Sequence, residues 1–215
     1  MLKRYGEDLN RLFEELIKMA ALATDAVRKS ARALTEGDAA AAGEVVRGDD
    51  AVDGYEKEIE QNALRIIVKY QPVANDLREV TCALKMITDI ERIADQAADI
   101  ASLSAKIGEA VRYEKVTAMA AHVASMAESA VNAFVNGDVA AAQATIKSDD
   151  VSDALFAEIK DEMCDRLKAR PESAEKIIYV MMIAKYLERI GDHAVNIAEW
   201  AIFSVSGMYK DSRLM

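Results

Sequence analysis

The sequence is poor in residues that interrupt helices and in residues that build sheets. It contains 9 Gly and 2 Pro among 215 residues, with only 7 Tyr, 4 Phe and 1 Trp. No β-branched run alternates with a period of two, so a sheet is not expected. The scarcity of helix breakers and the abundance of Ala, Glu, Lys, Met and Leu favour long α-helices.

Positive charge is also in short supply. The chain has 27 Lys and Arg residues against 37 Asp and Glu residues, a formal net charge of −10. A nucleic-acid backbone would be repelled by such a surface, so no nucleic-acid partner is expected. An acidic surface is instead suited to collecting cations or to contacting a basic partner.

The chain lacks cysteine pairs, targeting signals and long apolar runs. Cys82 and Cys164 form no CxxC motif and no site with histidine, so we interpret them as inert core thiols in a reducing compartment. The first ten residues, MLKRYGEDLN, contain no apolar signal-peptide segment. The longest apolar run, residues 177–184, is far shorter than the roughly 18 residues of a membrane span. We therefore expect a cytoplasmic protein that does not insert into the membrane.

What the chain does have is an internal repeat. The Gly-Asp pair at 37–38 recurs at 137–138, and the DDxxD segment at 49–53 recurs at 149–153, each 100 residues later. The segment ERIAD at 91–95 recurs as ERIGD at 188–192, 97 residues later. The three missing residues fall in the turn near Pro72 and Pro171, where deletions are tolerated. The chain is therefore read as two copies of one unit, residues 1–107 and 108–215.

Each unit is expected to contain three long helices. The first helix is predicted at about 7–36 and again at 114–136, each ending at a glycine, and the second ends near Pro72 or Pro171. Asp38 and Asp138 are suited to cap the second helices, and Asn75 and Ser173 to cap the third ones, which extend to about 104 and 205. Short turns between long helices make antiparallel neighbours. The predicted fold is all-α, two tandem three-helix bundles.

An acidic stripe follows the third helix of each unit. Its members are spaced i, i+4, i+8, which places them on one helix face: Glu91, Asp95 and Asp99 in the first unit, and Glu188, Asp192 and Asn196 in the second. Like charges at i, i+4 destabilise a helix by roughly 0.2–0.5 kcal/mol per pair. Neither stripe lies near a helix N-terminus, so compensation of the helix dipole does not explain it.

The second helices add a matching set of carboxylates, Asp49 with Asp53 and Asp149 with Asp153. Counted from Pro72, Asp53 and Glu91 are each 19 residues away, and Asp49 and Asp95 are each 23 residues away. In the second unit the corresponding four residues, counted from Pro171, are 17–22 residues away. At about 1.5 Å per residue, each set of four lies within roughly one helical turn of the same height.

Four carboxylates at one height repel each other unless a cation neutralises them. All the candidate ligands are oxygens, which indicates a hard divalent cation such as Mg²⁺, Mn²⁺ or Ca²⁺, or iron, rather than a Cys/His zinc site. The ten candidate metal residues are Asp49, Asp53, Glu91, Asp95, Asp99, Asp149, Asp153, Glu188, Asp192 and Asn196. A solvated acidic face on a plain helical scaffold is the competing interpretation.

At these residues the sequence resembles the PhoU family. The resemblance is carried by ERIGDHAVNIAEW at 188–200, its counterpart ERIADQAADIA at 91–101 and the two DDxxD segments, and it extends over essentially the whole chain. It implies tandem three-helix bundles whose E/DxxxD motifs bind metal ions. Two positions depart from the family motif: Ala94 stands where the family has Gly, and Asp99 stands where it has Asn.

The resemblance also implies a function. Proteins of this family negatively regulate the phosphate-starvation response, modulate phosphate uptake and link the ATPase of a phosphate ABC transporter to a sensor histidine kinase. We therefore expect a metal-binding adaptor, a homodimer, with no catalysis of its own. The alternative enzyme would be a carboxylate-bridged di-metal oxidase, but such helical bundles use Glu-x-x-His motifs and the sequence contains none.

Overall fold

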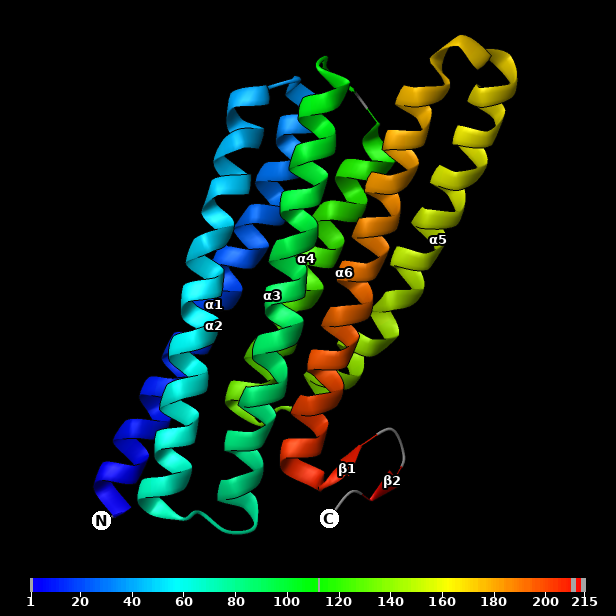
Figure 1. Ribbon diagram of the computed structural model, residues 1–215. Coiled ribbons are helices and arrows are strands. Elements are labelled where there is room, and N and C mark those ends of the chain that lie inside the picture. The colour runs from blue at the N-terminus through cyan, green and yellow to red at the C-terminus, as the bar shows by residue number, and fades with distance from the viewer. Residues whose placement is uncertain (1, 112, 210–211, 214–215) are drawn as a thin grey trace.

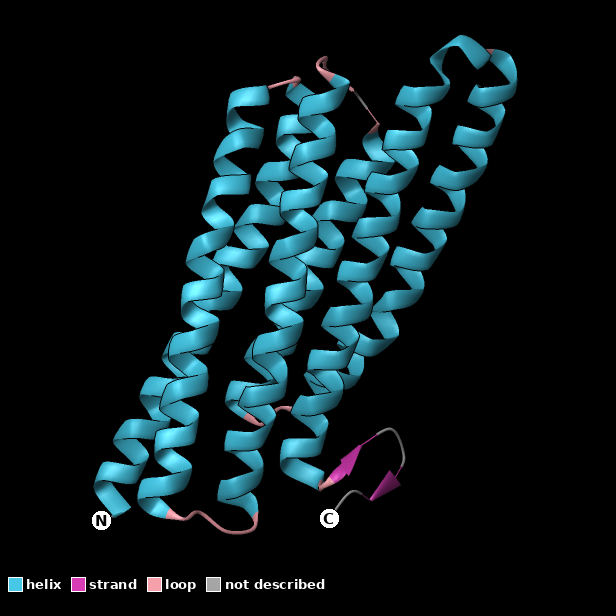
Figure 2. Cartoon of the chain, viewed as in Figure 1, coloured by secondary structure: helices cyan, strands magenta, loops and turns pink. Residues whose placement is uncertain are grey.

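The described residues fold into six α-helices followed by one short β-ribbon. The computed structural model describes residues 2–111, 113–209 and 212–213. The helices are α1 (Leu2–Glu36), α2 (Ala39–Tyr70), α3 (Asn75–Ile107), α4 (Glu114–Asn136), α5 (Val139–Ala169) and α6 (Ala174–Ser206), with a 3₁₀ turn at Pro171–Ser173. Strands β1 (Met208–Tyr209) and β2 (Ser212–Arg213) pair antiparallel after α6, a ribbon that the sequence did not predict. The all-α fold of two three-helix units is confirmed (Figure 2).

The helix ends follow the predicted signals in part. Gly37 and Gly137 adopt positive φ of 70° and 63° after the first helices, as expected. Asp38 caps α2 by accepting from the backbone amides of Ala40 and Ala41 at 2.9 and 3.0 Å, and Asp138 caps α5 by accepting from Ala141 at 2.9 Å. These two side chains therefore orient the helices that carry the DDxxD segments.

The third helices begin where the sequence predicts, but the predicted side-chain caps do not form. Ala74, at φ 51°, occupies the N-cap position of α3 in place of Asn75, and it makes no side-chain cap. Ser173 does precede α6, but its hydroxyl does not cap the helix. Both α3 and α6 are held instead by extensive burial, since 14 and 13 of their residues are buried.

The two units pack against each other through four helices. Helix α1 contacts α4, and α3 contacts α6, whereas α2 packs mainly on α1 and α3, and α5 mainly on α4 and α6. Figure 1 shows that α3 and α6 run in opposite directions side by side, with α2 and α5 on the two flanks. Consistent with this, Arg78 near the start of α3 reaches the Val205 carbonyl near the end of α6. The units are thus related by a pseudo-twofold axis.

The larger of two hydrophobic clusters is shared by both units. It extends without interruption from Leu12 and Leu16 of α1 to Ile190 and Ile197 of α6, all fully buried or nearly so. Cys82 belongs to this core, and burial raises the pKa of its thiol to about 12, as expected for an inert residue. Cys164 is exposed on α5, so its assignment to the core was wrong. No helix in the described ranges is long and apolar enough to cross a membrane.

Candidate metal centre

The first cluster lies between α2 and α3, at the height that residue counting predicted. Burial first, and then the negative charges of Asp95, Asp53 and Asp99, raise the pKa of the Asp49 carboxyl to about 6. Glu91, whose side chain is 17% exposed, has its pKa raised to about 7 by burial and then by Asp95. The structure therefore brings together all five carboxylates predicted for the first unit.

Glu56 is a member of this cluster that the sequence reasoning missed. Burial and the neighbouring charge of Asp53 raise the pKa of its carboxyl, and Glu56 in turn raises the pKa of Glu91. It lies three residues after Asp53 on the same face of α2, so helical spacing alone could have found it. The comparison of repeats could not, because Phe156 occupies the equivalent position of the second unit.

The second cluster lies between α5 and α6. Asp149 has a raised pKa, first because of burial and then because of Asp153 and Glu188, and Asp192 has a raised pKa for the same reasons. Ser152 is fully buried and donates to Asp149 Oδ1 at 2.5 Å, which offsets part of the effect of burial. The four carboxylates predicted for the second unit are thus neighbours as well.

A glycine on α6 makes room for this second cluster. A Cβ at Gly191 would lie 2.9 Å from Asp149 Oδ1 and 3.2 Å from Ser152 Oγ, closer than van der Waals contact allows. The equivalent residue of the first unit is Ala94, which lies buried opposite Val52, the counterpart of Ser152. The glycine at 191 therefore leaves the space that Asp149 and Ser152 occupy.

Asn196 and Asp99 have partners outside the clusters. Asn196 donates to Asp89 Oδ1 of α3 at 3.2 Å, and His193 Nδ1 lies 2.9 Å from the same oxygen. At the pseudo-symmetric position, Asp99 lies beside Tyr186, whose pKa is raised first by burial and then by the charge of this carboxylate. Both residues therefore connect α3 to α6 across the centre of the molecule, and a ligand role for Asn196 stays a prediction.

Cationic side chains partly neutralise each cluster. Arg92 Nη1 lies 3.0 Å from Asp95 Oδ2, and Arg92 Nε lies 3.4 Å from Glu91 Oε2. In the second cluster Lys185 Nζ lies 2.5 Å from Glu188 Oε2. One positive side chain against four or more carboxylates leaves an excess of negative charge in both places.

The chemistry of the donor set fits a hard metal ion. Every grouped donor is a carboxylate oxygen, the ligand that Mg²⁺, Ca²⁺ and Mn²⁺ prefer. Burial first, and then the neighbouring carboxylates, raise the pKa values of Asp49 and Glu91. In the described part of the chain, however, no three acidic, His or Cys side chains already stand in an arrangement that could hold a metal. The carboxylates are gathered, but their side chains would have to rotate to form a coordination sphere.

These features define a class: helical repeat proteins that carry one carboxylate cluster between the second and third helices of each repeat. The comparison with known families is in agreement, because the PhoU domain model matches residues 16–104 and again residues 116–201. The chain belongs to the PhoU domain family.

Several relatives match this chain over most of its length. A phosphate-specific transport system accessory protein PhoU homolog of Clostridium acetobutylicum is 30% identical over 213 residues, 97% of each chain. A homolog of the same name from Aquifex aeolicus is 33% identical over 186 residues, 85% of this chain and 84% of its own. The crystal structure of PhoU from Pseudomonas aeruginosa superposes with a TM-score of 0.90 at 29% identity, covering 95% of this chain and 100% of that one.

Proposed function

We propose that this protein is a regulatory accessory protein of phosphate transport that represses the phosphate-starvation response when phosphate is abundant. The observation that carries the proposal is the pair of carboxylate clusters at equivalent positions of the two repeats, in a chain whose family is shown. The relatives that match it along most of its length are named as accessory proteins of a phosphate-specific transport system.

Metal binding at the two clusters is part of this proposal. Asp49, Asp53, Glu91 and Asp95 would hold the ions of the first cluster, with Glu56 beside them, and their counterparts in α5 and α6 those of the second. A bound divalent or iron cation would supply positive charge that neutralises the carboxylates. The protein's own contribution is to hold these groups at one height across two helices, so that binding stabilises the pairing of α2 with α3 and of α5 with α6.

We further propose that the protein acts by contact rather than by catalysis. The partners would be the ATPase of a phosphate ABC transporter and a sensor histidine kinase, and the active form would be a homodimer. Long helices around one continuous core give rigid faces for docking. The net charge of −10 suits basic partner surfaces, so these associations should weaken as salt rises.

A deletion strain tests the regulatory role. Expression of phosphate-starvation genes should rise in phosphate-rich medium when the gene is removed, and the wild-type gene should restore repression. Normal repression in the deletion strain would rule out the regulatory role.

Complementation with Glu91→Gln and Glu188→Gln variants then tests how the clusters act. If the clusters only support the fold, repression should fail in proportion to the loss of stability. If a bound metal faces a partner, repression should fail while the variant stays folded.

A further inference from the structure

The groove between α1 and α2 contains a series of cross-helix polar pairs. At one end, Asp8 accepts from Lys69 Nζ at 2.9 Å, and this contact is the main reason why the pKa of Asp8 is lowered. At the other end, Asn62 Nδ2 donates to Oε2 of the buried Glu15 at 2.8 Å. Each end of the groove thus has its negative group matched to a donor from the facing helix.

The middle of the groove is different, because two arginines face it and the one acid beside them, Asp8, already accepts a hydrogen bond from Lys69. Arg11 of α1 and Arg65 of α2 line one cavity of about 200 Å³, with Asn62, Ile66 and the two end residues around it. Arg65 donates only to the neutral Asn62 Oδ1, at 2.8 Å. Among the described residues, neither guanidinium lies within ion-pair distance of a carboxylate. Both arginines are exposed, and the charge of Arg11 helps to lower the pKa of Asp8, so the single carboxylate of the cavity offsets only part of its positive charge.

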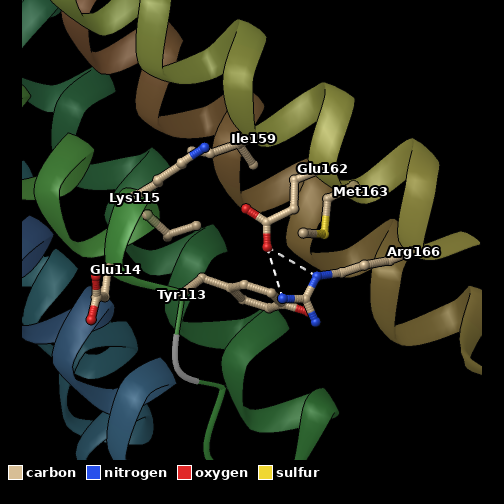
Figure 3. A pocket seen from close by; sticks show the side chains of 8 residues that line it. Tyr113, Glu114, Lys115, Ile159, Glu162, Met163 and Arg166 are labelled. Atoms are coloured by element: carbon tan, nitrogen blue, oxygen red, sulfur yellow. Dashed lines mark hydrogen bonds and ion pairs between the residues drawn. The ribbon is translucent and has the colours of Figure 1, made fainter.

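The second unit has a cavity that shares the positions of Asn62 and Ile66, as Glu162 and Arg166, and in which the cations are paired. This cavity of about 270 Å³ lies between α4 and α5 (Figure 3). Arg166 Nη2 lies 2.7 Å from Glu162 Oε1, and its guanidinium sits 4.7 Å from the centre of the Tyr113 ring. Lys115 Nζ lies 2.9 Å from Glu158 Oε2. Each basic group of this cavity therefore has its own carboxylate.

The two units differ in sequence at the positions of these arginines. The positions equivalent to Arg11 and Arg65 in the second unit are Val111 and Asp165. From residue 61 to residue 75 the first unit contains no acidic residue at all, in a chain whose net charge is −10. The unpaired arginines are thus a property of the first unit and not of the repeat.

We propose that the groove between α1 and α2 is a binding site for a small phosphoryl oxyanion, held by Arg11 and Arg65 with Lys69 at its edge. A planar guanidinium can donate two parallel hydrogen bonds to two phosphate oxygens. Two guanidinium groups, one from each helix, can therefore bind the same anion. Three cations and one carboxylate, Asp8, leave a local charge of about +2, which matches a phosphate dianion. The cavity of about 200 Å³ has room for such an anion with some water, since a water molecule takes up about 30 Å³.

This site goes beyond the proposed regulatory role and does not depend on it, because binding is measured on the purified chain alone. The full-length protein would be titrated with sodium phosphate in the presence of EDTA, which removes any metal that could itself bind phosphate. Arginine side-chain NMR signals would report binding, with sodium chloride at matched ionic strength as the reference. Saturable shifts of the Arg11 and Arg65 signals are expected with phosphate and not with chloride.

Two variants and one matched control make the test specific. Arg11→Gln and Arg65→Gln should each weaken phosphate binding by about tenfold or more, the usual loss for a charge-assisted hydrogen bond. Arg166→Gln removes a paired arginine from the second unit and should leave phosphate binding unchanged. Backbone NMR spectra of each variant establish that it is folded.

A second titration, with glycerol 3-phosphate, distinguishes free phosphate from a phosphoryl group on a larger molecule. Affinity equal to that for phosphate would mean that the site accepts the phosphoryl group of a larger molecule, and much weaker binding would assign it to the free ion. The proposal is overturned if phosphate produces no more change than chloride. It is equally overturned if the two arginine variants bind phosphate as well as the wild type does.

Discussion

Replacing Glu91 with Gln should stabilise the metal-free protein at alkaline pH. The folded state holds the pKa of Glu91 at about 7, against an ordinary value of 4.5. Between these two values the unfolded chain has lost its proton while the folded chain keeps it, so stability falls as pH rises from about 4.5 to 7. Above pH 7 the folded state carries the full cost of a charged, partly buried carboxylate.

The size of the effect follows from this shift. At about 1.4 kcal/mol per pKa unit, the upper limit is about 3 kcal/mol, and screening by solvent reduces it to roughly half. Glu91→Gln also loses a contact with Arg92 at 3.4 Å, a pair with an exposed arginine that contributes less than about 1 kcal/mol. We therefore expect a gain of about 1 kcal/mol at pH 8 in EDTA and almost none at pH 4.5.

Urea unfolding at the two pH values measures this gain, with an unchanged denaturant slope as the sign that only stability has changed. Glu188→Gln is the matched control from the other repeat. Glu188 lies 2.5 Å from Lys185, so its replacement should be neutral or cost up to about 1 kcal/mol. If Glu91→Gln destabilises the protein at pH 8 as much as Glu188→Gln does, the first cluster is not electrostatically strained.

Three further outcomes are expected. Mn²⁺ or Mg²⁺ should raise the melting temperature of the wild type but not of an Asp95→Asn/Asp192→Asn variant, since binding to the folded state alone stabilises it; an equal rise in both would contradict the site assignment. Gly191→Ala should lower the free energy of unfolding in urea by about 1 kcal/mol, because the new Cβ would crowd Asp149. Ala is the better helix former, so a gain in stability would show that α5 can move aside. Gln96→Leu should gain about 1 kcal/mol, because the side-chain amide of Gln96 is buried without a hydrogen-bond partner; a loss would point to a bound water.

The repeat made the fold and the two clusters predictable from sequence. Matching heights of the acidic residues about Pro72 and Pro171 placed each set of carboxylates correctly, because long uninterrupted helices turn sequence separation into distance. What the heights could not provide is the direction in which a residue points around the helix. Asn196 was assigned to the acidic stripe, yet its side chain donates a hydrogen bond to Asp89 of α3. The packing of α3 on α6 determines this contact.

The capping of the third helices was less predictable than the helix ends. Gly37 and Gly137 identified the ends correctly, because few other residues adopt positive φ without strain. At the start of α3, however, the turn places Ala74 in a positive-φ conformation that its residue type does not favour. The conformation is imposed by the need to join two packed helices, information that is absent from the local sequence.

The continuous core between the two units couples the stability of one carboxylate cluster to that of the other, although the clusters share no side chain. Helices α1 and α3 would leave a wide apolar face uncovered without α4 and α6, so neither half of the chain has a complete interior by itself. Local opening of one repeat must then disturb the other, and the chain should unfold as one cooperative unit. An ion that binds only at the α2–α3 cluster would consequently slow amide exchange in α5 and α6 too.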